Sequence, residues 1–237
     1  MLVFADESTW GGDPRAADKL KGMVTESTIN IERKFLPLIE EPSALHIIMA
    51  SNNEWPVAIP MDDRRYLVLD VSDAKRQNDT HFAPLRDELA RGGLAAFLYD
   101  LLAHPIDEHA LRHPLSTPGK RDVTALSLKP VQHWWLERLH MGNFADGEAE
   151  WPEKMLKAAA LEDYLLFLDK HHRDGRTRRA TETELGTFLQ PYGWSYRCMT
   201  DGKRDVWWKL RPLAECRAIW AKACGWTDYT WDADTDA

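Results

Sequence analysis

The chain has 237 residues, of which 44% are apolar and 29% charged, and its formal net charge is −8. This composition is ordinary for a globular protein with one large domain or two small ones. The acidic balance excludes a protein that coats nucleic acid over its whole surface, so any phosphate contacts must come from local basic patches. The longest apolar runs are far shorter than the roughly 18 residues of a membrane span. No basic segment precedes the apolar start, so we expect a cytoplasmic protein with no membrane partner.

The cysteines and tryptophans indicate buried cores rather than metal sites. The three cysteines lie far apart, without a Cys-x-x-Cys pair or a histidine at ligand spacing, at Cys198, Cys216 and Cys224. Neither disulfides nor a zinc site is expected. Eleven tryptophans are many for this length. Buried anchors of small domains are the favoured explanation, with base stacking as the minority one.

The chain opens with an apolar run, residues 2–5, that ends in Asp6 and Glu7. Such a run is typical of a buried parallel strand that delivers carboxylates at its C-terminal end. It also has the form of a Walker B strand, in which the aspartate helps to hold Mg²⁺ and the glutamate polarises the attacking water. Chance produces this pattern often, so alone it is weak.

A helix and a hairpin are predicted next. Asp13 is the expected N-cap of a helix from residue 14 to about residue 25. Residues 28–39 then alternate in the manner of a β-hairpin, with Arg33 and Lys34 between its two strands. The tip would be basic, either as a solvated turn or as a phosphate contact.

A second buried strand is predicted over residues 45–51, followed by Asn52 and Asn53. An amide side chain at the end of such a strand can stand beside the γ-phosphate and the attacking water, as a sensor does in ATPases with a central parallel sheet. The alternative is a turn, which asparagine favours.

A third strand is predicted over residues 66–71, directly after Asp62-Asp63-Arg64-Arg65. A positioned arginine can stabilise the charge on a phosphoryl group that is transferred in a neighbouring subunit. The alternative for Arg64 and Arg65 is a surface ion-pair cluster.

The remaining sequence is predicted to be helical apart from one hairpin. Residues 78–105 fit two helices, which would cover the sheet as a lid. Residues 106–150 are predicted to be a connector with one helix. Residues 151–226 give helix, helix, hairpin and helix, with a turn at Asp201-Gly202, an order that suggests a winged helix. The acidic residues 227–237 are expected to form a loose tail.

Within the winged-helix region, a capping box from Thr181 to Glu184 is predicted to open the second helix. That helix and the hairpin tip would face DNA. Phosphate contacts are expected from five basic residues: Arg176, Arg178, Arg179, Lys203 and Arg204. Many winged helices serve only protein contacts, which is the alternative.

Four segments taken together resemble a known family. They are residues 2–7, 20–26, 47–55 and 63–71, and they are similar in order and spacing to the superfamily 3 helicase region of phage and poxvirus-type primase-helicases. The resemblance covers roughly residues 1–105, with a weaker match through the C-terminal domain. It implies an α/β fold, in which part of a P-loop, AAA+-like parallel-sheet ATPase core with a helical lid precedes a winged helix.

The resemblance also implies roles for particular residues. Asp6 and Glu7 would be the Walker B acids, with Asp6 holding Mg²⁺ when ATP is bound. Asn52 would be the likeliest sensor, and Arg64 or Arg65 the arginine finger. The whole protein would be a DNA-replication helicase that unwinds DNA with ATP.

The hairpin has an implied role as well. In a homo-hexameric ring the tips bearing Arg33 and Lys34 would form a basic collar around single-stranded DNA. Duplex DNA would bind at the winged helix.

One departure from the family pattern limits these expectations. The family needs a phosphate-binding loop, and the only Gly-Lys pairs, Gly119-Lys120 and Gly202-Lys203, lack both a Ser or Thr after them and a glycine five residues before. We therefore expect a truncated gene product or a fragment of a longer protein. The chain alone is expected to bind no cofactor and to have negligible ATPase activity.

Two other functions remain open. The chain could be a non-enzymatic DNA-binding protein, in which the ATPase half is scaffold and the winged helix is active. It could also be a metal-dependent nuclease or phosphatase that uses Asp6, Glu7 and Asp13. Salt-dependent DNA binding without nucleotide dependence would favour the first, and Mg²⁺-dependent cleavage the second.

Overall fold

The computed structural model describes residues 1–7, 14–32, 34–107, 115–144, 150–171, 178–200, 202–226 and 228–231. Several predicted features lie outside these ranges, namely Asp13, Arg33, Arg176 and most of the acidic tail. The side chains of Arg178, Arg179 and Lys203 are also not described. No helix among the described residues combines the length and apolar character that crossing a membrane requires.

The fold is mixed α/β, and its contacts divide it into two units, Met1–Asp63 with Arg121–Ala237, and Arg64–Lys120. The first unit holds a parallel strand pair, an antiparallel hairpin and an antiparallel three-stranded sheet. The domain boundaries expected from the sequence stay predictions.

The two predicted parallel strands are confirmed as neighbours. Strand β1 (Leu2–Ala5) pairs in parallel with β4 (His46–Met49), with Leu2 opposite His46 and Ala5 opposite Met49. Their expected burial is wrong, because residues along both strands alternate between exposed and half-buried. Successive side chains point to opposite faces, which gives the alternation, and neither strand has a second hydrogen-bonded neighbour among the described residues.

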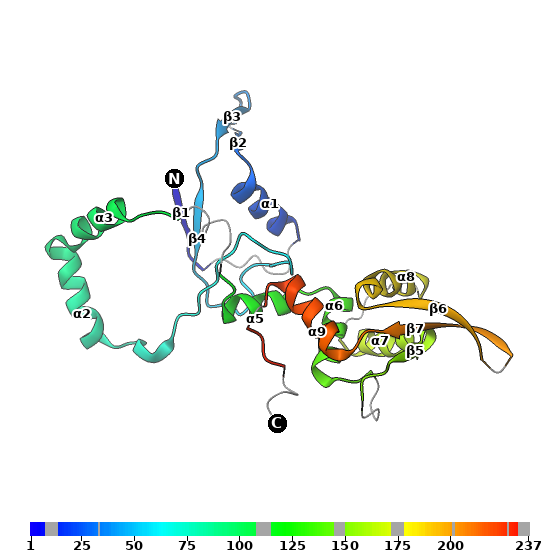
Figure 1. The fold of residues 1–237 in the computed structure, drawn as a ribbon. Helices are drawn as coiled ribbons and strands as arrows, with labels where there is room; N and C mark the ends of the chain where they lie inside the picture. The colour runs from blue at the N-terminus through cyan, green and yellow to red at the C-terminus, as the bar shows by residue number, and fades with distance from the viewer. Residues whose placement is uncertain are drawn as a thin grey trace. The chain divides into compact units, whose positions relative to one another are not determined.

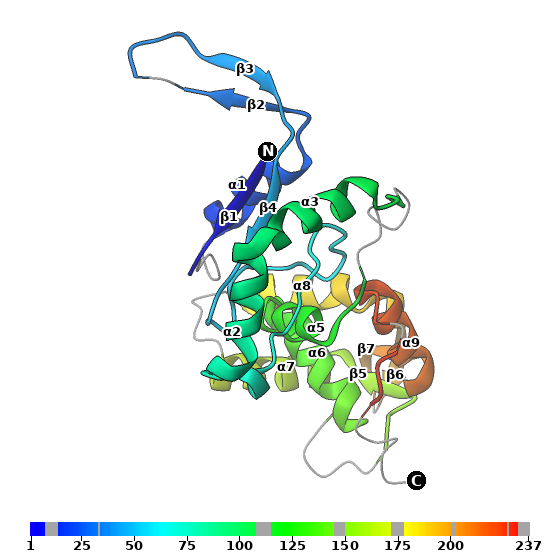
Figure 2. The ribbon, with the colours of Figure 1, turned by 90° about the vertical axis from the view of Figure 1, so that its left-hand side faces the viewer.

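The predicted helix and hairpin between these strands are confirmed. Helix α1 (Pro14–Thr25) buries Leu20. Strands β2 (Thr28–Ile31) and β3 (Ile39–Pro42) pair antiparallel, and this hairpin stands clear of β1 and β4 in both ribbon views (Figures 1 and 2).

In the second unit, the predicted strand over residues 66–71 is wrong. These residues form no ladder, and the backbone carbonyl of Val68 accepts a hydrogen bond from the Thr117 hydroxyl. A side chain thus takes a carbonyl that a strand would offer to a neighbour. Exposure is high along the run, with Leu69 at 69% and Val71 at 91%.

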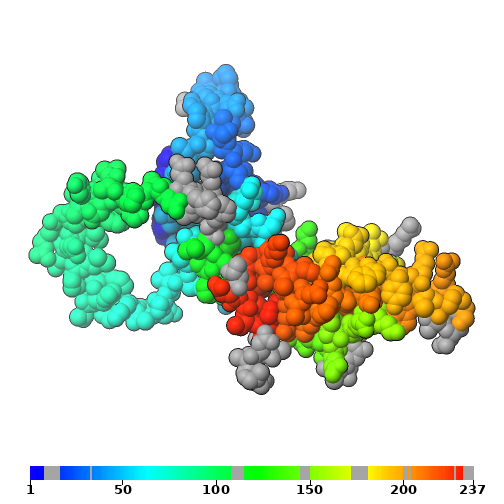
Figure 3. All heavy atoms as spheres, viewed as in Figure 1, coloured from blue at the N-terminus to red at the C-terminus, as the bar shows by residue number. Residues whose placement is uncertain are grey.

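The two helices predicted after this run are confirmed. They are α2 (Asp79–Glu88) and α3 (Leu94–Ala103), preceded by the short η1 (Asp73–Lys75) and separated by η2 (Leu89–Gly93). Gly92 breaks the helical path with φ 106°, a conformation that glycine adopts easily. No side chain of α2, η2 or α3 is buried, and Figure 3 shows the segment as a narrow band of turquoise and green atoms. Its role as a lid stays a prediction.

The region expected to be a connector holds two helices instead of one, α5 (Pro118–Leu126) and α6 (Pro130–Met141). The additional helix α5 begins at Pro118, and proline suits the first position of a helix. The Thr117 hydroxyl caps α5 by accepting the backbone N–H of Lys120 at 3.2 Å. Gly142, with φ 68°, ends α6.

The helices and the hairpin that follow come in the predicted order of helix, helix, hairpin and helix, but the sequence did not predict the strand β5 (Lys154–Leu156) that precedes them. The elements after β5 are α7 (Lys157–His171), α8 (Arg178–Phe188), η3 (Gln190–Tyr192), β6 (Gly193–Thr200), β7 (Lys203–Leu210) and α9 (Leu213–Cys224). The strands form an antiparallel sheet in the order β5-β7-β6.

The predicted capping box is wrong. Helix α8 begins at Arg178, three positions before Thr181, and Thr181 is 1% exposed inside the helix. Glu184 accepts a hydrogen bond from the Tyr164 hydroxyl of α7 at 3.4 Å. These two residues therefore contribute to packing and to a contact between helices.

One core joins α6 to the C-terminal elements. Trp134, Trp135 and Trp220 are fully buried in it, which confirms the favoured explanation for these tryptophans. Trp194, at 53% exposed, is an exception.

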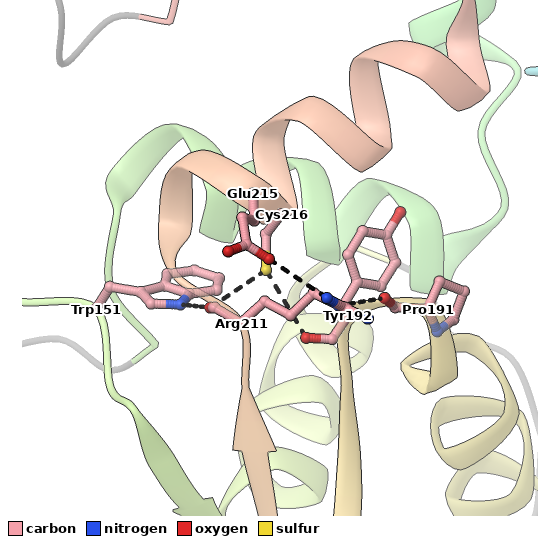
Figure 4. Close-up of polar contacts among 6 residues, drawn as sticks. All are labelled: Trp151, Pro191, Tyr192, Arg211, Glu215 and Cys216. Carbon is pink, nitrogen blue, oxygen red and sulfur yellow. Dashed lines mark hydrogen bonds and ion pairs between the residues drawn. The ribbon is translucent and has the colours of Figure 1, made fainter.

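Arg211 holds the junction between β7, η3 and α9 (Figure 4). Its backbone carbonyl accepts the indole N–H of Trp151 at 2.9 Å, and its Nε donates to the carbonyl of Pro191 at 3.1 Å. Its Nη1 donates to Glu215 at 3.3 Å, while the Cys216 thiol lies 3.5 Å from its carbonyl oxygen. Every contact serves packing of the junction.

The cysteines are expected to differ strongly in reactivity. Burial raises the pKa of both the Cys216 and the Cys224 thiols to about 12, whereas Cys198 is exposed. Only thiolates are alkylated rapidly, so iodoacetamide at about pH 8 should modify Cys198 alone in the folded protein, as peptide mass spectrometry can show. Equal labelling of all three without denaturant would contradict this packing.

Candidate functional site

The C-terminal ends of β1 and β4 meet at one edge of the parallel pair. Just beyond the last paired residues, the backbone N–H of Ala50 donates to the carbonyl of Ala5 at 2.9 Å. The residues that follow each strand therefore leave the pair at the same edge. We call them the carboxyl edge, and they are Asp6, Glu7, Ser51, Asn52 and Asn53.

Both acids of the carboxyl edge are exposed. The Oδ1 atom of Asp6 accepts the backbone N–H of Glu7 at 3.0 Å. Glu7 has φ 50°, in the left-handed region that residues other than glycine seldom adopt. The chain thus turns sharply where the strand ends, and two adjacent carboxylates remain open to solvent.

The two asparagines differ in what their side chains do. The Oδ1 atom of Asn53 accepts the backbone N–H of Trp55 at 3.0 Å, and the N–H of Asn53 donates to Ser51 Oγ at 3.1 Å. Asn53 is therefore a turn former. Asn52 is exposed, and its amide has no hydrogen-bond partner among the residues that the structure describes.

Ser127, which the sequence analysis did not single out, anchors the segment after the carboxyl edge. Its Oγ accepts the indole N–H of Trp55 at 2.9 Å and the backbone N–H of Ile59 at 3.0 Å, and it donates to the Val123 carbonyl at 2.7 Å. Ile59 itself is fully buried. Because Trp55 and Ile59 are about 70 positions from Ser127 in the chain, no local sequence pattern indicates that Ser127 binds them.

Arg64 and Arg65 belong to the other unit. Arg64 is exposed and Arg65 half-buried. Their roles as an arginine finger stay predictions.

Neither Gly-Lys pair is built to hold phosphate. A Cβ atom on Gly119 would lie 2.5 Å from Asp70 Oδ1, so a carboxylate already occupies the first turn of α5. The first turn of a helix is where a phosphate would bind, and here the Asp70 carboxylate takes that place. Gly202, with φ 75°, lies between β6 and β7.

No group of three or more His, Cys, Asp or Glu side chains is placed to hold a metal in the described part of the chain. The pair of acids at the carboxyl edge still suits Mg²⁺, which usually takes one or two carboxylates along with waters and substrate phosphates. Asp13 lies outside the described residues, so its part in the nuclease alternative stays open.

The predicted DNA-binding residues lie in two places. Lys34 is exposed in the β2–β3 loop, with its Nζ 5.2 Å from the ring centre of Phe35, which is 92% exposed. Arg178 and Arg179 open α8, and Lys203 and Arg204 open β7. Arg204 is exposed.

Comparisons with known proteins support the fold more than a function. Residues 1–65 match the model of a family of unknown function, DUF5906. No curated protein sequence matches. Two solved apo structures of the NrS-1 C-terminal region, one covering residues 305–718 and one an A form, are similar with TM-scores of 0.60 and 0.59.

The identities to these structures are 16% and 17%, and the similarity covers 89% of this chain. It covers 55% of each solved chain, so this chain spans about half the length of the proteins it matches. The fold of the described residues is thus similar to part of the NrS-1 C-terminal region.

Proposed function

We propose that this chain is part of a DNA-replication ATPase of phage or prophage type, whose whole protein unwinds DNA. The observation that carries the proposal is the carboxyl edge, where two acids and the Asn52 amide follow adjacent parallel strands at the same edge. That amide has no hydrogen-bond partner in the described part of the chain. The resemblance to superfamily 3 primase-helicases and the fold similarity to the NrS-1 C-terminal region support it.

Each residue at the carboxyl edge has a distinct proposed role. Asp6 would hold Mg²⁺, which when bound with ATP neutralises charge on the phosphates. Glu7 would polarise the attacking water by accepting its proton. Asn52 would orient that water, because its amide makes no hydrogen bond to a described residue whereas the Asn53 amide is used in a turn. Arg64 or Arg65 would act on the site of a neighbouring subunit.

DNA would be bound away from the carboxyl edge. In a homo-hexamer, the hairpin tips with Arg33 and Lys34 would line a channel for single-stranded DNA, and the exposed ring of Phe35 could stack on a base. The C-terminal helices and the β6–β7 hairpin would form a winged helix for duplex DNA.

The chain alone is expected to hydrolyse ATP negligibly, because its sequence contains no phosphate-binding loop. A coupled assay with MgATP and single-stranded DNA measures this, and appreciable turnover would refute it.

In a longer protein that includes such a loop in frame before Met1, Asp6→Asn and Glu7→Gln should each lower turnover about 10²-fold or more. Asn53→Ala is the matched control, and unchanged turnover in both acid variants would end the helicase assignment.

A second function is favoured by the order of the C-terminal elements. Helices α7, α8 and α9 with the β6–β7 hairpin have the order of a DNA-binding winged helix, so the chain could bind DNA without being an enzyme. Affinity for duplex DNA that falls with salt and is unchanged by ATP would favour this alternative. No affinity even at low salt would exclude it.

A further inference from the structure

One face of the β5-β7-β6 sheet combines aromatic rings with lysines. Residues directly opposite each other on paired strands share a face. Lys154 and Trp194 both lie opposite Lys209, while Leu156 and Tyr196 both lie opposite Trp207. We call these six residues the outer sheet face.

Next to β5 the opposite face belongs to the core, whereas towards the tip of the β6–β7 hairpin it is exposed. Met155 and Ser195 lie opposite Trp208, and Met155, Trp208 and Leu210 are buried. Because side chains alternate along a strand, the outer sheet face points away from this core.

The rings of the outer sheet face are accessible and already attract cations. Trp194 is 53% exposed, and the Lys209 Nζ lies 5.7 Å from its ring centre. The Lys154 Nζ lies 5.9 Å from the ring centre of Trp207. Tyr196 and Trp207 are half-buried. Since Tyr196 is opposite Trp207 and two residues from Trp194, the three aromatic residues occupy adjacent positions on the sheet.

We propose that the outer sheet face binds single-stranded nucleic acid. Trp194 stacks on one base, Tyr196 and Trp207 contact the next, and Lys154 and Lys209 contact phosphates. Exposed aromatic rings on a sheet are suited to unpaired bases, whose faces are free, and flanking lysines neutralise the backbone. This inference does not rest on the carboxyl edge or on the tip of the β2–β3 hairpin.

The composition of the face distinguishes this partner from a protein. Lysine is depleted in the centres of protein interfaces, whereas here Lys209 is on the central strand between Lys154 and Trp194. Leu156 is the single aliphatic member. Two acids lie close by, namely Asp205, opposite Cys198 towards the hairpin tip, and Glu153, whose Oε1 is 3.1 Å from Lys209 Nζ. Glu153 is 77% exposed in its side chain, and such a surface pair is weak enough for a phosphate to replace it.

Fluorescence anisotropy with labelled oligothymidylate and oligouridylate of about 20 nucleotides tests the proposal, since single-strand site sizes are roughly 4–16 nucleotides. The full chain should bind at low salt without ATP. Trp194→Ala should weaken binding about 10-fold, and Trp194→Phe, which keeps a ring, should bind within about threefold of the wild type. Lys154→Gln and Lys209→Gln should each reduce the slope of log affinity against log salt by about 0.7. The strand that binds more tightly identifies DNA or RNA as the source.

Two controls separate this site from other surfaces. Met199→Ala removes a 65% exposed side chain from the opposite face of β6 and should leave affinity unchanged. Lys34→Gln changes the tip of the β2–β3 hairpin and should not alter the effect of Trp194→Ala on affinity. Wild-type affinity in Trp194→Ala, no binding at low salt, or equally strong competition by duplex DNA would each overturn the proposal. If Lys34→Gln alone weakens binding, the outer sheet face is rejected while the proposed helicase function stands.

Discussion

Replacing Asp163 by alanine is expected to lower the free energy of unfolding by about 3–5 kcal/mol, the usual cost of removing one partner from a buried ion pair. The Asp163 carboxylate on α7 accepts Nε and Nη2 of Arg138 on α6, at 2.8 and 3.0 Å, and the indole N–H of Trp134 at 2.7 Å. The side chains of Arg138 and Asp163 are only 9% and 16% exposed. Alanine would leave a buried guanidinium and an indole N–H without this acceptor. Urea denaturation followed by circular dichroism measures the loss.

The chain offers a matched control for this variant. Lys157 and Glu182 also form an ion pair, at 3.0 Å, but their side chains are 30% and 45% exposed. Glu182→Ala should therefore cost no more than about 1 kcal/mol. Burial raises the pKa of the Asp163 carboxyl, and the Trp134 hydrogen bond and the Arg138 charge oppose that effect. If Asp163→Ala is as mild as Glu182→Ala, the pair is not an anchor between α6 and α7.

Local patterns in the sequence predicted most of the elements. The apolar run of residues 2–5, the helical spacing after residue 14 and the alternation over residues 28–39 correspond to β1, α1 and the β2–β3 hairpin. In each case the periodicity of apolar residues determines which face is covered. The expectation that β1 and β4 are parallel neighbours is confirmed as well.

Predictions failed where the outcome depends on distant partners. Residues 66–71 have the composition of a strand, but a strand also needs a neighbour, and Thr117 bonds the Val68 carbonyl instead. The Thr-x-x-Glu pattern predicts that α8 begins at Thr181, yet Thr181 is buried inside the helix. A capping pattern and a packing position look alike in a sequence, since both favour a small polar residue.

The carboxyl edge was predictable in its strand placement but not in its details. Adjacent strands, and the acids and amides after them, follow from two apolar runs. The difference between the two asparagines does not follow from the sequence, because either amide could accept the N–H of a residue two positions further on, and in the structure it is Asn53 that accepts the N–H of Trp55. The tether through Ser127 likewise depends on contacts across 68 and 72 positions.

Replacing Trp135 by alanine is expected to cost about 3–5 kcal/mol, because a large ring in a packed core leaves a cavity. Trp135 is fully buried on α6. Its ring centre lies 4.6 Å from that of Tyr192, 5.6 Å from Trp151 and 5.7 Å from Phe144. The ring thus joins α6 to η3, to Phe144 and to Trp151. The loss should appear as a lower urea midpoint, whereas the exposed Trp194→Ala should change stability by about 0.5 kcal/mol or less.

The same variant tests whether the core supports the segment after the carboxyl edge. Ser127 follows α5 directly and holds both Trp55 and Ile59 through its hydroxyl, and partly buried Leu128 packs against the core cluster that contains Trp135. A weakened core should therefore loosen Ser127 and raise amide hydrogen exchange at Ile59, because exchange reports local opening. Ser127→Ala should also raise amide hydrogen exchange at Ile59, but with a smaller loss of global stability than Trp135→Ala. Unchanged exchange at Ile59 in Trp135→Ala would mean that this segment is held independently of the core.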